Sequence, residues 1–137
     1  MFDTLSVNIK VISYAPKVFH IIRKLDGLDE GQILSSIDPK NNRFQMFKVN
    51  RNNEIDFRRI YFYTHDRQFI IKSISSDEVS KLCENMKKMV KYLKQEKSQS
   101  LLSRIYGLYK VNLSGIKDIF LCIERNCVQV KSHNKLL

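Results

Sequence analysis

The sequence predicts an α+β fold, an antiparallel β-sheet with one long helix packed across it and shorter helices near the N-terminus. Apolar residues recur at three- and four-residue steps between Val79 and Leu93, the period of a helix with one buried face. Elsewhere, β-branched and aromatic residues gather in short runs, which is typical of strands. Polar turns join these runs, so neighbouring strands should be antiparallel.

The N-terminal part predicts two helices. The first is expected to begin at Pro16, a residue suited to the first helical turn, and to end at Gly27. A second, shorter helix is expected over Gln32–Ile37, followed by a turn at residues 38–42. The first helix should bury one face, formed by Val18, Phe19, Ile22 and Leu25.

The central part predicts three strands. Phe44–Val49 is rich in strand formers, and a turn at Arg51–Asn53 leads into Ile55–Tyr63. Residues 64–68 have the length and chemistry of a hairpin connection to the next strand, Phe69–Ile74.

The long helix is expected to start after Ser75, because Ser75 and Glu78 have the spacing of a capping box. Its buried stripe should contain Val79, Leu82, Met86, Met89 and Leu93. Its outer face is strongly basic through Lys81, Lys87, Lys88, Lys91 and Lys94.

The last part predicts strands at Ile105–Leu113 and Ile116–Glu124, joined at Ser114–Gly115, and a final strand at Cys127–Val130. The chain has 137 residues, of which 43% are hydrophobic, so it fits one compact domain. The formal charge of +10 predicts an acidic partner: nucleic acid, an anionic membrane or an acidic protein. A basic surface that only contacts solvent explains the charge equally well.

The cysteines and hydropathy predict an intracellular, reducing compartment, cytoplasmic or organellar, and membrane association through partners is compatible with this prediction. Cys83, Cys122 and Cys127 are odd in number and lack a C-x-x-C pair, so neither a disulfide framework nor a zinc site is predicted. No apolar run approaches the roughly 20 residues that span a bilayer. The N-terminus lacks the core of a secretory signal, and a mitochondrial presequence that had been removed would leave no trace.

Other candidate chemistry is weaker. His20, His65 and His133 are too scattered for a metal site or a catalytic triad, so structural or exposed positions are expected. Aromatic residues on strands could stack on nucleic-acid bases, but core positions explain them more simply and no RNP-type consensus is present. Nucleic acid is therefore not a favoured partner. These aromatic residues are Tyr61, Phe62, Tyr63, Tyr106 and Tyr109.

Several segments, in order, resemble the small lobe of the phosphatidylinositol phosphate kinase family. The more specific ones are the segment Thr64–Ile74, which reads THDRQFIIKSI, and Leu101–Val111, which contains LL followed by YGLY. Tyr14–Leu28 and Glu124–Asn126 match in the same order. The resemblance assigns residues 14–131 to a kinase-like small lobe, 1–13 to an N-terminal extension and 132–137 to a C-terminal tail.

In that family, the lysine of the Phe-Ile-Ile-Lys segment contacts ATP, and Lys72 is the matching residue. A lysine among apolar neighbours on a strand is costly to desolvate unless an anion meets it, and a nucleotide phosphate would serve. The alternative interpretation is that Lys72 reaches solvent at the sheet edge or pairs with a local carboxylate. We expect a vestigial ATP position and no bound cofactor.

Two departures from the family argue against catalysis. Family members place a glycine- and serine-containing loop before this lysine, whereas residues 49–59 contain no glycine and add Glu54 and Asp56. The large lobe of the family carries the catalytic and magnesium-binding aspartates, and the matched segments stop at Glu124–Asn126, where the small lobe ends. We therefore expect this chain alone not to be an enzyme.

An acidic partner for Lys72 on the long helix is not evident. The acidic residues in or beside this helix are Asp77, Glu78, Glu84 and Glu96. Glu78 is better explained by the cap, and Glu84 points away from the buried stripe.

The leading hypothesis is a non-catalytic, pseudokinase-like lobe that serves as a binding or structural subunit among other proteins. Two alternatives remain open. One is half of a split or truncated lipid kinase, active with a separate large lobe. The other is a module that binds anionic lipid through Lys87, Lys88, Lys91 and Lys94.

Overall fold

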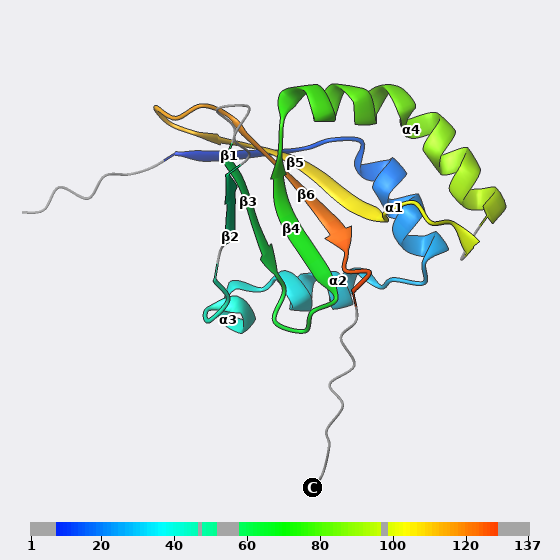
Figure 1. The fold of residues 1–137 in the computed structure, drawn as a ribbon, viewed down its shortest axis with the longest axis horizontal. Coiled ribbons are helices and arrows are strands. Elements are labelled where there is room, and N and C mark those ends of the chain that lie inside the picture. The colour runs from blue at the N-terminus through cyan, green and yellow to red at the C-terminus, as the bar shows by residue number, and fades with distance from the viewer. Residues whose placement is uncertain (1–7, 47, 52–57, 97–98, 129–137) are drawn as a thin grey trace, which may run out of the picture.

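The computed structural model describes residues 8–46, 48–51, 58–96 and 99–128, and it confirms the α+β class. Six antiparallel strands form one sheet in the order β1-β5-β6-β4-β3-β2. The long helix α4 extends from the β4 end of the sheet toward the β5 side, and the short helices α2 and α3 lie at the opposite end of β4 (Figure 1). The strands are β1 (Ile9–Ser13), β2 (Lys48–Arg51), β3 (Arg58–Tyr63), β4 (Phe69–Ile74), β5 (Ile105–Leu113) and β6 (Ile119–Arg125). The helices are α1 (Pro16–Leu25), α2 (Glu30–Ile37), α3 (Pro39–Asn42) and α4 (Ser76–Glu96).

The helix starts follow the local signals. Pro16 is the first residue of α1, as expected. Ser75 and Glu78 form the predicted capping box before α4: the Glu78 N–H donates to Ser75 Oγ, and the Ser75 N–H donates to Glu78 Oε2. The turn predicted at residues 38–42 contains the single helical turn α3, which starts where the Asp38 side chain accepts the Lys40 N–H.

The strand predictions for the central part were only partly right. The strand predicted from Phe44 begins at Lys48, because Phe44 and Met46 are each 80% exposed and have no core to pack against. The start of the strand predicted from Ile55 lies outside the described residues, and so does most of the glycine-free segment 49–59. The described part of that strand, β3, ends at Tyr63 as predicted.

The two ends of the predicted lobe also differ from expectation. Ile9–Ser13, placed by the sequence in an extension, is strand β1 and pairs with β5, so the sheet extends into that segment. Cys127 and Val128 are not in a strand; the Asn126 side chain accepts the Val128 N–H and bends the chain there. The rest of that predicted strand and the tail 132–137 lie outside the described residues.

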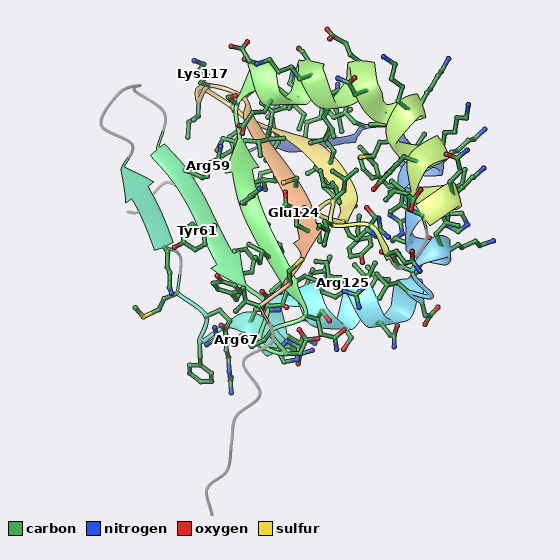
Figure 2. The ribbon with its side chains drawn as sticks, turned by 45° about the vertical axis from the view of Figure 1, so that its right-hand side comes forward. Arg59, Tyr61, Arg67, Lys117, Glu124 and Arg125 are labelled. Atoms are coloured by element: carbon green, nitrogen blue, oxygen red, sulfur yellow. The ribbon has the colours of Figure 1, made fainter. Side chains whose placement is uncertain are left out.

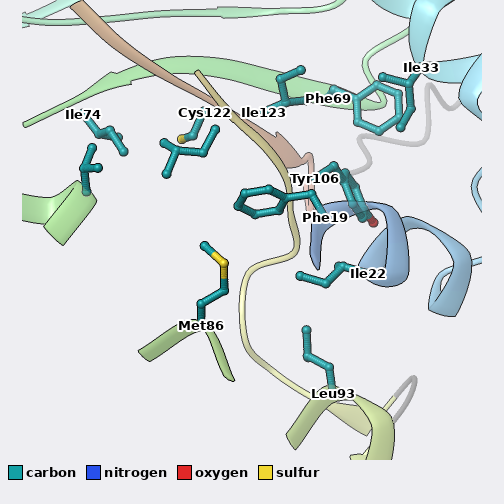
Figure 3. Packing of buried hydrophobic residues seen from close by; sticks show 12 residues of the cluster. Phe19, Ile22, Ile33, Phe69, Ile74, Met86, Leu93, Tyr106, Cys122 and Ile123 are labelled. Atoms are coloured by element: carbon teal, nitrogen blue, oxygen red, sulfur yellow. The ribbon is translucent and has the colours of Figure 1, made fainter. Parts of the chain in front are cut away.

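One hydrophobic core joins the helices to the sheet. Met86 and Leu93 of α4 point toward the same cluster as Phe19 and Ile22 of α1, and Cys122 of β6 is beside them (Figure 3). These residues are at most 5% exposed. The remaining buried members of the cluster are Ile33, Phe69, Ile74, Val79, Tyr106, Leu108 and Ile123.

The Tyr-Gly-Leu-Tyr segment has a structural explanation. The pairing of β5 with β6 is irregular between Ile105 and Gly107, so Tyr106 is an extra residue at a bulge. A Cβ on Gly107 would lie 2.7 Å from the ring of Tyr109, which means that only glycine leaves room for this ring. The buried Tyr106 hydroxyl reaches Asp26 at the end of α1 and donates to Oδ2 over 2.7 Å.

The Asp26 carboxylate also binds an arginine. Arg104 Nε lies 3.3 Å from Asp26 Oδ2, and the two side chains are only 8% and 9% exposed. Arg23 of α1 donates to the Tyr106 carbonyl over 2.7 Å. Burial, followed by the bond to Asp26, raises the pKa of the Tyr106 hydroxyl far above its ordinary value. This polar network ties α1 to the start of β5.

Candidate functional site

Lys72, the residue that matches the ATP-contacting lysine, is bound to a carboxylate of the same sheet. Its Nζ lies 2.7 Å from Glu124 Oε1 on β6, and the two side chains are 25% and 13% exposed. In the register, Lys72 faces Cys122 and Ile70 faces Glu124, so the pair is diagonal and on one face of the sheet. The structure thus agrees with the interpretation of Lys72 as an ion pair with a local carboxylate.

Two further groups fix the carboxylate of Glu124. Ser103 Oγ donates to Oε2 over 3.4 Å, and Cys122 Sγ donates to Oε1 over 3.8 Å. Burial is the main cause that raises the pKa of the Cys122 thiol to about 12, and the nearby Glu124 charge adds to it. Cys122 is therefore a protonated, unreactive neighbour rather than a nucleophile.

The pair lies on the part of the sheet beside α4. Residues 72 and 124 share their face with Ile74 and Cys122, which belong to the core cluster that includes residues of α4. Glu124 and Tyr61 lie on the strands to the left of α4 (Figure 2). Lys72 and Glu124 thus lie between the part of this face that belongs to the core cluster and the part near Tyr61 that does not.

Aromatic and cationic side chains continue this face toward β2. Tyr61 lies opposite Lys72 and Lys48 in the register, and its ring makes an edge contact with Tyr63 at 6.2 Å. Lys48 and Arg67 lie 5.7 and 5.5 Å from the centre of the Tyr63 ring. The core positions predicted for Tyr61 and Tyr63 were wrong: both are only half-buried, because the core cluster that α4 joins contains residues of β4, β5 and β6 but no described residue of β3.

The cap residue Glu78 binds Arg59 rather than Lys72. Arg59 Nη2 of β3 donates to Glu78 Oε1 over 2.7 Å, which connects the first turn of α4 to the sheet. Burial alone would raise the pKa of Glu78, but hydrogen bonds from the Ser75 N–H and from Arg59 outweigh it and lower this pKa. Glu78 of α4 is therefore the partner of Arg59. The partner of Lys72, Glu124 on β6, was not among the candidates that the sequence offered.

The basic residues of α4 are all on the surface. Lys87, Lys88, Lys91 and Lys94 are exposed, and none makes an ion pair with a described residue. Lys87, Lys91 and Lys94 are spaced by four and three residues, which places them on one flank of the helix, with Lys88 to the side.

The remaining candidates stay apart from one another. His20 Nδ1 lies 3.1 Å from Glu30 Oε1 at the surface, His65 is exposed in the β3–β4 turn, and His133 lies outside the described residues. Within the described ranges, no group of three His, Cys, Asp or Glu side chains could hold a metal ion. The helices of that same part are all too short or too polar to cross a membrane.

Known proteins similar to this chain are lipid kinases. The model of the family described as phosphatidylinositol-4-phosphate 5-kinase matches residues 50–135. The human phosphatidylinositol 5-phosphate 4-kinase type-2 beta is 24% identical over 124 residues, which cover 90% of this chain and 28% of that kinase. The type-2 alpha kinase of Mus musculus is 23% identical over 124 residues, 90% of this chain and 29% of that protein.

A third relative covers a similar share of this chain. A probable phosphatidylinositol phosphate kinase of Dictyostelium discoideum is 27% identical over 131 residues, which cover 89% of this chain and 17% of that protein. The chain thus spans less than a third of the length of these curated relatives. Its antiparallel sheet and its helices agree with the kinase-like small lobe that the sequence predicted. The chain belongs to the phosphatidylinositol-4-phosphate 5-kinase family, and it contains part of that family's domain.

Proposed function

We propose that these 137 residues act as a non-catalytic, pseudokinase-like lobe that serves as a binding or structural subunit of a larger protein assembly. The observation that carries this proposal is the 2.7 Å ion pair of Lys72 with Glu124. The ammonium group that would meet a nucleotide phosphate already has its counter-charge within the sheet. In protein kinases the corresponding lysine pairs with a glutamate of the adjoining helix while it contacts the phosphates, whereas the carboxylate bound to Lys72 comes from β6.

Apolar side chains on the sheet face opposite α4 are consistent with binding to another protein. By strand alternation, Ile9 and Val11 of β1 share this face with Val111 and Leu113 of β5, which lie opposite them in the register. Ile9 and Val11 are 62% and 58% exposed. Ile60 of β3, on the same face by register, is 40% exposed. Exposed apolar residues on one face of a sheet favour association with another surface.

Native mass spectrometry of the chain, expressed with an affinity tag in its own cell type, tests the proposal. We expect a defined complex with stoichiometric protein partners. A matched variant, Val11→Lys with Ile60→Lys, should reduce that complex while the far-UV circular dichroism stays unchanged. A chain that is stable, monomeric and without partners would contradict the proposal.

A second candidate is half of a split or truncated phosphatidylinositol phosphate kinase. It is favoured by the position of Lys72 on the sheet face that α4 covers in part. It is also favoured by the relatives, which are named as phosphatidylinositol phosphate kinases. Isothermal titration with Mg-ATP, alone and with a separately expressed large lobe of a related kinase, tests it. Binding and lipid phosphorylation only in the mixture would support this candidate, whereas no binding in either sample would exclude it.

A third candidate is a module for anionic lipid, favoured by the exposed lysine flank of α4. Co-sedimentation with vesicles that contain phosphatidylserine or a phosphoinositide should then fall steeply with salt. Replacement of Lys87, Lys91 and Lys94 by glutamine should abolish it. Replacement of three basic residues elsewhere, Lys17, Lys24 and Lys117, is the control of equal charge.

A further inference from the structure

We infer that the loop of residues 43–46 docks on a membrane and inserts apolar side chains into a bilayer that contains anionic lipid. These residues follow α3 and precede β2. They lie at the end of the sheet opposite the start of α4 (Figure 1). The inference goes beyond the proposed function, because it assigns a surface and a lipid partner that the subunit role does not require.

Two large apolar side chains of this loop face solvent. Phe44 and Met46 are each 80% exposed. They alternate with the polar Gln45, which is only partly exposed. Apolar side chains that project into water gain free energy on transfer to hydrocarbon, and aromatic and aliphatic side chains insert at the boundary between head groups and acyl chains. The loop therefore has the side chains that an interfacial anchor requires.

Hydrogen bonds hold the base of the loop, so its projection is built into the fold. The Gln45 N–H donates to the Asn42 carbonyl over 2.9 Å, which closes a turn. The Asn42 side chain accepts the His65 N–H over 2.9 Å and donates to the Ser36 carbonyl over 2.7 Å. These bonds attach the loop to α2 and to the β3–β4 turn. A loop that is already ordered loses little entropy when it docks.

Cations surround the two apolar side chains. The Arg43 guanidinium lies over the Phe44 ring, 4.7 Å from its centre. Beyond Met46, Lys48 and Arg67 lie 5.7 and 5.5 Å from the centre of the Tyr63 ring. Basic side chains next to a bilayer are attracted to anionic lipid. Four exposed cations in this region form no ion pair with a described residue: Lys40, Arg43, Lys48 and Arg67.

Two carboxylates lie near the same loop, and both are fixed in its base. Asp38 Oδ1 accepts the Lys40 N–H, and Asp66 accepts hydrogen bonds from the hydroxyls of Ser36 and Thr64. The four cations outnumber these two carboxylates, so the net field at the loop attracts an anionic surface. A projecting apolar pair among cations matches a bilayer, in which charged head groups cover hydrocarbon.

The loop differs from the basic flank of α4, the surface of the anionic-lipid candidate. The apolar residues Met86 and Leu93 of α4 are buried in the core, so they are not available to lipid. Binding through that flank would depend on charge, with Tyr92 as its exposed aromatic residue. The loop at Phe44 instead places apolar side chains inside the bilayer. The depth of a side chain in the membrane separates the two surfaces.

A fluorescent reporter measures that depth. The sequence contains no tryptophan, so Phe44→Trp introduces a single one into the full chain. The probes are vesicles of phosphatidylcholine with and without phosphatidylserine. The emission should shift to shorter wavelength only with the anionic vesicles, and lipids brominated in their acyl chains should quench it. Tyr92→Trp, at a position 39% exposed on α4, is the control and should show neither change.

Co-sedimentation with the same vesicles measures the contribution of the apolar pair. Phe44→Ser with Met46→Ser should weaken binding at least roughly tenfold. Leu101→Ser with Ile116→Ser removes apolar side chains that are 101% and 60% exposed elsewhere, and it should leave binding unchanged. Arg43→Gln should weaken binding and reduce its dependence on salt. Far-UV circular dichroism checks the fold of each variant, and the Phe44→Trp reporter decides the question if a serine variant is unfolded.

Absence of binding to anionic vesicles would overturn the inference, and so would equal losses in the two serine pairs. A response of the reporter at position 92 without one at position 44 would also overturn it and would assign lipid binding to α4. A reporter at position 44 that only a co-purified protein shields would identify a protein-binding loop and equally contradict the inference. The subunit proposal fails separately, since native mass spectrometry decides it without vesicles.

Discussion

Lys72 on β4 and Glu124 on β6 form a diagonal ion pair across the centre of the sheet, with 2.7 Å between Nζ and Oε1. It is the observation on which the proposed function depends. Partial shielding from water strengthens the attraction relative to an exposed surface pair, while desolvation of the two charges offsets part of that gain. Its energy can be measured.

A double-mutant cycle isolates that energy. Lys72→Met, Glu124→Gln and the double variant should give a coupling free energy of about 1 kcal/mol in urea unfolding. The same cycle at the more exposed pair Lys110–Asp118 should give a smaller coupling. A coupling near zero at Lys72 and Glu124 would mean that the carboxylate is not bound to the lysine in solution.

The core contact of α4 is the second test. Met86 is 5% exposed and lies in the cluster beneath the sheet, so Met86→Ala should lower the free energy of unfolding by about 2–4 kcal/mol. Lys87→Ala, the next residue but exposed, should change it by no more than about 0.5 kcal/mol. Equal effects of the two substitutions would show that α4 is not packed as described.

The polar network at the end of α1 provides the third test. Asp26→Asn leaves the buried Arg104 with a weakened counter-charge and should cost about 3 kcal/mol. Tyr106→Phe removes only the hydroxyl that donates to Asp26 and should cost about 1–2 kcal/mol. The measurement is urea unfolding, and a larger cost for Tyr106→Phe than for Asp26→Asn would contradict this order.

Acid should weaken the attachment of α4 to β3. The folded-state pKa of Glu78 is below its ordinary value of 4.5, so the carboxylate stabilises the fold above pH 4.5. That contribution is lost as the pH falls through the folded-state value. The difference in unfolding free energy between the wild type and Glu78→Gln should therefore shrink on acidification below pH 4.5. A difference that stays constant or grows would contradict the bonds from Ser75 and Arg59.

Thiol reactivity should separate the three cysteines. Cys83 and Cys127 are exposed, whereas Cys122 is 1% exposed and has a pKa of about 12. Under native conditions near pH ~8, iodoacetamide should modify Cys83 and Cys127 and spare Cys122 until urea is added. Peptide mass spectrometry gives the sites. Rapid native labelling of Cys122 would mean that the sheet opens beside Lys72.

Local signals in the sequence were enough to predict where the helices that contain them begin. Pro16 and the Ser75–Glu78 box started their helices where predicted, because caps and first turns depend on a few neighbouring residues. Helical spacing likewise identified Met86 and Leu93 as buried. The segment around Phe44 failed because strand-forming residues make a strand only where a partner strand and a core are present.

The sequence by itself determined the fold class, the family resemblance and Lys72 as the residue to examine. Only the tertiary structure decided what Lys72 binds. Its partner lies 52 positions later, and the β4–β6 register, not any sequence spacing, brings the two charges together. The partial burial of Tyr61 and Tyr63 was likewise decided by the tertiary structure, because the core cluster that α4 joins contains no described residue of β3. Long-range pairing of strands and the placement of a helix over them depend on packing of the whole chain, which local patterns do not encode.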